Sequence, residues 1–275
     1  MANSVNTNNG ALVALQNLNA TNAQLATTQT RINTGMKVAN ARDNGAIWAI
    51  AQGQRADIRA LGAVKSSLDR GLSAVDVSLA AGESVSDLLV QLKEKALAAT
   101  DKSLTTASRN ALNEDFKSIR DQITTVTNNA DFNGINLLKT GAVGFQALAN
   151  ASGTASMTVK PEVMALGSTN VTVASTTVID TMTKATASLA LVNASIDLVS
   201  GALARIGTKS KAIETHITFV GKLTDALETG VGNLVDADLA KESAKLQALQ
   251  TKQQLGVQAL GIANQTPQIL LSLFQ

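Results

Sequence analysis

The chain has 275 residues, a formal net charge of +2 and a hydrophobic content of 45%, with only 2% aromatic residues. A net charge so close to zero excludes electrostatic binding of nucleic acid as the main activity. The absence of cysteine excludes disulfide bonds and thiolate chemistry, and with only two prolines most of the chain is free to form long helices.

The N-terminal segment has an apolar repeat but no charged side chain before Arg31. Apolar residues recur every seven positions, which predicts a helix that packs against other helices. The outer face of a helix in a soluble protein normally carries charge, so we expect the other faces of this helix to be covered as well. The residues of this repeat are Ala11, Leu18, Leu25 and Ile32, and Leu12 and Leu15 lie on the adjoining face.

The same segment is not expected to be a cleavable signal peptide, because it lacks a basic start and an unbroken apolar run. No window of about 20 apolar residues is evident in the chain, so membrane insertion is not expected either. If the protein leaves the cell, we expect it to use another route.

Residues 35–57 are interpreted as a linking segment. Trp48, the only tryptophan, lies here in a glycine-containing stretch that we expect to be a loop. We interpret it as a packing anchor between inner and outer layers of helices rather than as an aromatic binding site.

Helical patterns cover residues 58–98 and 112–126, with a polar break between them. The second helix is expected to end at Asn129, ahead of the Asn-Gly turn in DFNGINLL (131–138). Residues 140–182 are rich in glycine, serine, threonine and alanine. Short alternations there, such as Val171 and Val173, predict β-hairpins.

The clearest helical signal follows this region and is expected to end at GVGN (230–233). His216, the only histidine, flanks the repeat and is expected to face solvent, because one histidine without cysteine rarely forms a metal or acid–base site. The unbroken seven-residue series consists of Val192, Val199, Ile206, Ile213, Val220 and Leu227.

The last predicted helix begins after Asp236 and Asp238, which we expect to cap it rather than to act as paired catalytic carboxylates. No charged side chain follows Lys252. Two seven-residue apolar series run through this region. The first includes Leu246 and Leu260, and the second consists of Leu255, Ile262 and Ile269.

These elements predict a mainly α fold, in which long antiparallel helices form a coiled-coil-like bundle with a small β-hairpin region and an elongated, hairpin-shaped subunit. Residues 1–34 and 234–275 are expected to be paired terminal helices of an inner core, and residues 58–233 a helical bundle domain that includes the β-hairpin region 140–182. We expect the two ends to be disordered in the monomer and to fold on assembly with other copies, because each buries too little alone.

Catalytic motifs are not evident in the sequence. Glycine-rich phosphate loops and nucleophile elbows are absent. We therefore expect no enzymatic activity, no metal and no cofactor, and an ordinary intramolecular bundle remains an alternative explanation of the heptads.

The chain resembles bacterial flagellin. SVNTNNGALVALQNL (4–18), RINTG (31–35) and ARDNGAIWAIAQ (41–52) are similar to the N-terminal signature of that family, and DFNGINLL is similar to its turn before the hairpin region. Residues 234–274 resemble its C-terminal signature. Many relatives carry large outer domains between the helices, so the resemblance is to a short form.

The resemblance implies an extracellular filament for swimming motility, in which paired terminal helices line a central channel. It implies self-polymerisation, with or without paralogous flagellins, and export of unfolded subunits through the flagellar type III apparatus with a chaperone. Hook-associated proteins and the filament cap are the implied partners, with no nucleic acid and no membrane insertion. The residues expected to form the polymerisation core are Ala11, Leu15, Leu18, Leu25, Ile32, Leu246, Leu255, Leu260, Ile262 and Ile269.

Two surface features are also implied by the resemblance. Flagellins that activate the animal innate-immune receptor present an Arg, a Leu and a Glu, and the matching positions here are Gln91, Lys95 and Gln122, so we expect a degenerate patch. Several flagellins carry O-linked sugars on outward-facing hydroxyls, although serine and threonine also suit turns and exposed strands. The candidate O-glycosylation sites are Thr154, Ser156, Thr169, Thr172, Ser175, Thr176 and Thr177.

Two other functions remain open from the sequence. A hook–filament junction protein shares both terminal motifs but is present in few copies. A type III secreted effector would bind host membranes or proteins as a monomer and form no ordered polymer.

Overall fold

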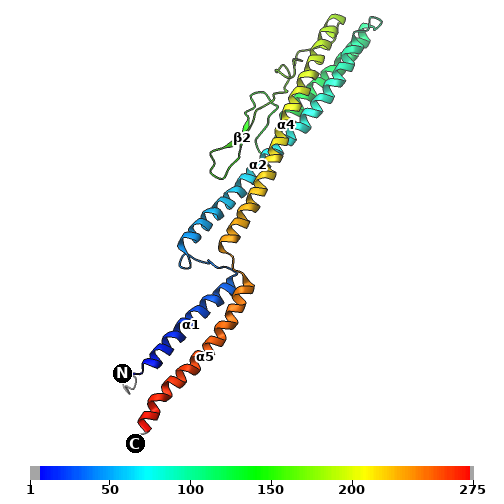
Figure 1. Cartoon of the computed structure of the whole chain (residues 1–275). Helices are drawn as coiled ribbons and strands as arrows, with labels where there is room; N and C mark the ends of the chain where they lie inside the picture. Colours follow the sequence, from blue (N-terminus) through cyan, green and yellow to red (C-terminus); the bar gives the residue numbers. More distant parts are fainter. Residues whose placement is uncertain (1–6, 273–275) are drawn as a thin grey trace. The chain divides into compact units, whose positions relative to one another are not determined.

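The computed structural model describes residues 7–272, with the side chains of residues 7–265 (Figure 1). The elements in chain order are α1 (Asn9–Thr34), α2 (Gly45–Ala99), α3 (Thr106–Asn129), β1 (Phe145–Leu148), β2 (Ser156–Val159), α4 (Met182–Val235) and α5 (Leu239–Ser272). The mainly α fold with a small β-hairpin is therefore confirmed. The chain forms two compact units, Met1–Ala56 with Ala226–Gln275, and Asp57–Asp225. The domain bounds expected from the sequence remain a prediction.

In the first unit, α1 and α5 lie side by side (Figure 1). Asn8 caps α1 by accepting a hydrogen bond from the Ala11 amide at 3.0 Å, and Gly35 ends the helix in the left-handed conformation with φ 69°. Asp238 accepts from the Lys241 amide at 3.1 Å, so its expected capping role is confirmed. The Ala237 amide donates to the Gly35 carbonyl at 2.9 Å, which joins the end of α1 to the start of α5.

In the second unit, α2, α3 and α4 form a bundle whose core includes Leu89 and Phe116. The first five members of the predicted α4 series, from Val192 to Val220, are at most 1% exposed. A Cβ added at Gly82 of α2 would lie 2.6 Å from Cδ2 of Leu203 on α4. The two helices therefore approach so closely at this point that only glycine fits without a shift.

The hairpin region contains one antiparallel pair, in which Phe145 opposes Val159 and Leu148 opposes Ser156. The expectation of a further strand around Val171 and Val173 is wrong. Both side chains are fully buried, but the Thr172 amide donates to Oγ of Ser195 on α4 at 2.9 Å rather than to another strand. The alternating apolar residues of this segment are therefore buried against helix α4 and do not form part of a sheet.

Three local expectations are corrected by the structure, and two of them concern helix ends. Trp48 lies in α2 rather than in a loop, because the Asn44 side chain caps the helix by accepting from the Ile47 amide at 3.1 Å. Residues 230–233 do not break α4, which continues to Val235. A glycine costs a helix only about 1 kcal/mol, which packing can offset.

The third correction concerns His216, which is half-buried rather than fully exposed to solvent. Its Nε2 lies 2.8 Å from the carbonyl oxygen of Ala149, in the loop between β1 and β2. Because a carbonyl oxygen only accepts, Nε2 carries a proton and donates it. The lone histidine therefore holds the hairpin loop on α4.

The expectation that no stretch is apolar enough to cross a membrane is also wrong. α4 contains an 18-residue stretch with a mean hydropathy of 1.5, which satisfies the length and composition of a span. Only 28% of that stretch is buried in the protein. The same helix supplies the Val192–Val220 series to the bundle core, and core helices of soluble proteins commonly pass this test.

Candidate assembly site

The α1/α5 seam is built from two alternating three- and four-residue repeats. On α1, Thr21 and Thr28 are 3% and 0% exposed, between half-buried leucines and an isoleucine. On α5, Leu249 is 6% exposed. The full repeats are Leu18, Thr21, Leu25, Thr28 and Ile32 on α1, and Leu246, Leu249, Gln253, Gly256 and Leu260 on α5.

Polar contacts fix the antiparallel register of this seam. Asn8 donates from Nδ2 to the Ala263 carbonyl at 2.7 Å, and Gln253 donates from Nε2 to Oδ1 of Asn22 at 2.8 Å. A Cβ added at Gly256 would lie 3.3 Å from Cδ1 of Leu18. The seam is thus narrow at its centre and hydrogen-bonded on both sides.

The residues expected to form the polymerisation core divide into two groups. Those of the seam are half-buried: Ala11, Leu18, Leu25, Ile32, Leu246 and Leu260. The others face away from the seam, because Leu15, Leu255 and Ile262 are 44%, 59% and 67% exposed. Ile269 falls outside the residues whose side chains the structure describes.

Three further exposed apolar side chains, all in the charge-free parts of α1 and α5, lie outside the core that the sequence predicts. Leu12, Val13 and Val257 are 59%, 58% and 56% exposed. Leu12 lies on the face that adjoins the seven-residue series, whereas Val13 and Val257 lie off that series and periodicity alone does not select them. Their exposure on a charge-poor helix pair is the signal that identifies them.

A shallow pocket of about 410 Å³ lies at the start of α1. Its lining carries no ionisable side chain, so it is suited to hold an apolar group rather than to perform chemistry. The lining residues are Thr7, Asn8, Ala11, Leu12, Leu15, Leu260 and Asn264. Within the described part of the chain, no cluster of three or more His, Asp or Glu side chains could hold a metal.

Trp48 is half-buried in α2, and its role as a packing anchor stays a prediction. Of the patch expected to correspond to the receptor site, Gln91 on α2 and Gln122 on α3 are exposed. Lys95 pairs with Asp115 at 2.8 Å, and this hydrogen bond raises the pKa of the lysine. The behaviour of the patch toward the receptor stays a prediction.

The candidate O-glycosylation sites differ in how they are placed. Thr172 and Thr177 are half-buried and their hydroxyls are engaged, because Thr172 donates to the Leu191 carbonyl at 2.9 Å and Thr177 accepts from the Ala174 amide at 3.0 Å. The exposed sites are Thr154, Ser156, Thr169, Ser175 and Thr176. Modification of any of them stays a prediction.

Comparison with known proteins gives consistent matches over both ends of the chain. The family model of the bacterial flagellin N-terminal helical region matches residues 5–142, and that of the C-terminal helical region matches residues 189–274. The flagellins FljM and FljK of Caulobacter vibrioides are each 54% identical over 273 residues, with 99% of both chains covered. The flagellin of Brucella melitensis is 37% identical over 281 residues, again with 99% of both chains covered.

Among solved structures, a protein described as flagellar hook-associated from Vibrio parahaemolyticus superimposes with a TM-score of 0.56 at 16% identity. The match covers 70% of this chain and 100% of the Vibrio chain. At this identity the likeness shows a shared fold and nothing further.

Proposed function

Because the chain belongs to the bacterial flagellin family, whose members are structural subunits of the extracellular flagellar filament, we propose that the α1/α5 pair is its self-assembly site. The protein is a non-enzymatic filament subunit. What is proposed here is which side chains join one copy to the next.

The observation that supports this proposal is the set of apolar side chains left uncovered around a completed seam. Leu12 and Val13 on α1, and Leu255, Val257 and Ile262 on α5, are each more than half exposed. Burial of such a side chain contributes about 1.5–3 kcal/mol. Charged side chains are absent before Arg31 and after Lys252, so little opposes the burial of these faces against other copies.

The export route and the further partners are also proposed. Family membership supports export of unfolded subunits through the flagellar type III apparatus with a chaperone, and contact with hook-associated and cap proteins at the filament ends. The presence of several flagellins in Caulobacter vibrioides supports assembly with paralogous subunits.

The test compares aspartate substitutions on the two kinds of position. Ile262→Asp places a charge on an exposed side chain and should leave the circular dichroism and thermal unfolding of the monomer unchanged while preventing filament growth from seeds. Leu18→Asp should prevent growth and also disrupt the seam. The conservative variant Ile262→Leu should polymerise normally.

Normal filaments from Ile262→Asp, seen by electron microscopy, would refute the proposed site. If the wild-type protein formed only short assemblies of a few copies, a role as a hook–filament junction protein would be favoured instead.

A further inference from the structure

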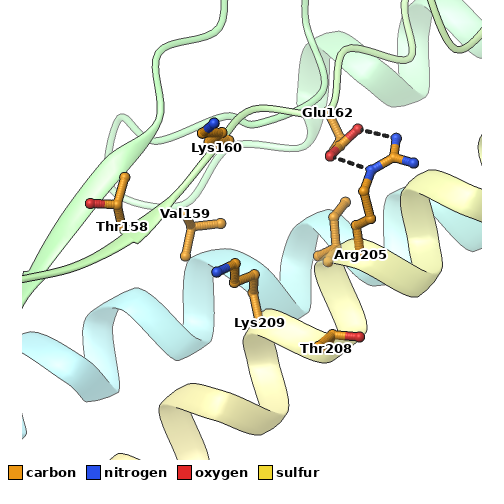
Figure 2. A pocket seen from close by; sticks show the side chains of 8 residues that line it. Thr158, Val159, Lys160, Glu162, Arg205, Thr208 and Lys209 are labelled. Carbon is orange, nitrogen blue, oxygen red and sulfur yellow. Dashed lines mark hydrogen bonds and ion pairs between the residues drawn. The ribbon is translucent and has the colours of Figure 1, made fainter.

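A second surface with features of a binding site lies in the Asp57–Asp225 unit. The end of β2, the segment after it and one face of α4 line a pocket of about 420 Å³ (Figure 2). Its lining includes Val159 and Ile206, which are 2% and 1% exposed. The pocket therefore has an apolar interior beneath a polar rim.

The rim of this pocket is positively charged. Arg205 donates from Nε and Nη2 to the Glu162 carboxylate at 2.8 and 2.6 Å, which leaves that pair neutral. Lys160 and Lys209 lie on either side of Val159 in Figure 2, and both are exposed. Neither lysine forms an ion pair with another described residue.

The outer face of α2 carries the opposite charge to the pocket rim. Glu83, Asp87, Val90, Glu94 and Leu97 follow one another at alternating four- and three-residue spacing, and all five are exposed. Val90 and Leu97 are 55% and 56% exposed, whereas Leu89 on the packed side of the helix is fully buried. We call these five residues the acidic face.

The acidic face is electrostatically unfavourable in an isolated subunit. Like charges four residues apart, as at Glu83 and Asp87, destabilise a helix by about 0.2–0.5 kcal/mol. Within the described residues neither carboxylate has an ion-pair partner. A cationic partner outside the subunit would remove this cost and would also cover the two apolar side chains.

We propose that the acidic face of one subunit docks in the basic pocket of a second copy of this chain. The inference rests on the proposed function, since it requires that the chain polymerises. Carboxylates of the acidic face meet Lys160 and Lys209, and an apolar side chain of that face enters the pocket between the two lysines. Charge complementarity of this kind orients two copies and rejects the reverse pairing.

The arrangement is also suited to an open polymer. The two surfaces are different parts of one unit, so their contact is heterologous and can repeat without closing into a dimer. Gly82 opposes Leu203, and Ser210 donates to Asp76 at 3.4 Å, so the pocket is level with α2 residues 76–82. Docking of Asp87 therefore shifts neighbouring copies along the helix axis by roughly 8–16 Å, at about 1.5 Å per residue.

Cross-linking between cysteine variants tests the contact directly, because the wild-type chain has no cysteine. Filaments grown from an equal mixture of Lys209→Cys and Asp87→Cys chains should give linked dimers when treated with a short bis-maleimide, because the backbones of a lysine–aspartate pair lie too far apart for a direct disulfide. Filaments of either variant alone should give none, and neither should a mixture of Lys209→Cys with Ser66→Cys, whose serine is exposed on α2 outside the acidic face. Absence of dimers from the first mixture would overturn the proposal.

Charge reversal provides the second measurement. Lys160→Glu/Lys209→Glu and Glu83→Lys/Asp87→Lys should each raise the critical concentration for seeded growth about tenfold, because like charges then face each other. The variant with all four substitutions should return close to the wild-type value. An unchanged critical concentration in either double variant, or no recovery in the fourfold variant, would overturn the contact while the filament function stands. Failure of the wild-type chain to polymerise at all would overturn both.

Discussion

Arg31 of α1 donates a hydrogen bond from Nη1 to Oε1 of Glu242 on α5, with 3.0 Å between the two atoms. The side chains are 29% and 12% exposed, and among the described residues this is the only ion pair between the two helices. Arg31 is also the first charged residue of the sequence. This charged pair at the end of the seam acts together with the hydrogen bonds of Asn8 and Gln253 to fix which register the two helices adopt.

Glu242→Gln should therefore lower the stability of the assembled α1/α5 pair. The substitution keeps the shape but leaves Arg31 without a charged partner, and the expected loss is about 1–3 kcal/mol. It should appear as a lower depolymerisation temperature of filaments. The matched control is Glu114→Gln, which removes a surface ion pair between Glu114 and Lys117. Because the Glu114 side chain is 71% exposed, this substitution should change stability by at most about 0.5 kcal/mol. Equal effects of the two substitutions would show that the seam pair does not set the register.

Gly256 should not tolerate a large side chain. A Cβ at this position would lie 3.3 Å from Leu18, so Gly256→Val would force α1 and α5 apart and prevent filament growth. Gly62→Ala is the matched control, because a Cβ on this α2 glycine would meet open space. That control should polymerise normally and gain about 0.5–1 kcal/mol of stability from helix propensity. Filaments of normal yield from Gly256→Val would contradict the close approach of the two helices.

Periodicity predicts the helices and the core better than it predicts which face meets which neighbour. It places Leu18 and Leu25 correctly in the seam and the first five members of the α4 series correctly in the core, whereas the sixth, Leu227, is only half-buried. It misses the buried threonines of α1, because threonine does not count as apolar although its methyl group packs well between helices. On α5 both heptad series look equivalent in the sequence, and only the structure separates Leu260 in the seam from Ile262 on the outside.

The remaining differences have a common cause, which is that tertiary packing overrides local signals. The glycines at 230 and 232 suggest a break, yet α4 runs through them. Val171 and Val173 alternate like a strand but lie against a helix. The pocket around Lys160 and Lys209 joins segments about 45 residues apart, and no pattern in the sequence brings them together.

Acid should weaken the second unit through Glu162. The hydrogen bonds from Arg205 lower the pKa of this carboxyl group below its ordinary value. A group whose pKa is lowered by folding stabilises the folded state at pH values above its unfolded pKa, which is about 4.3 for glutamate. This stabilisation is lost as the pH falls through the pKa of the folded state. Glu162→Gln should therefore lower the free energy of unfolding at neutral pH by about 1 kcal/mol, and the difference should shrink in strong acid, as the pH falls through the lowered pKa of Glu162. Urea unfolding at neutral pH and in strong acid measures it, and a difference that grows in acid would contradict the assignment.

O-glycosylation, if present, should occur at the exposed hydroxyls of the hairpin region. Thr169, Ser175 and Thr176 are exposed, whereas Thr172 and Thr177 already use their hydroxyls within the fold. Native filament subunits should then have an intact mass above that of the bare sequence. Alanine at Ser175 and Thr176 should reduce the added mass, and alanine at Thr172 should not. A native mass equal to that of the unmodified chain would exclude the modification.

Activation of the animal innate-immune receptor should be weak or absent, even for free monomer. Interface energy concentrates in a few anchors, and here all three expected anchors are replaced, the Arg by Gln91, the Leu by Lys95 and the Glu by Gln122. In the structure Lys95 pairs with Asp115 at 2.8 Å, so this position carries a charged, hydrated group where the receptor site has an apolar anchor.

The variant Gln91→Arg/Lys95→Leu/Gln122→Glu should raise the response in a receptor-reporter assay. Loss of the Lys95 pair should cost little folding stability, because Asp115 is 57% exposed and stays hydrated. Lys95→Ala alone is the control, since it breaks the same pair without supplying an apolar anchor and should not raise the response. Potent activation by the wild-type monomer would show that the receptor reads other residues of this chain.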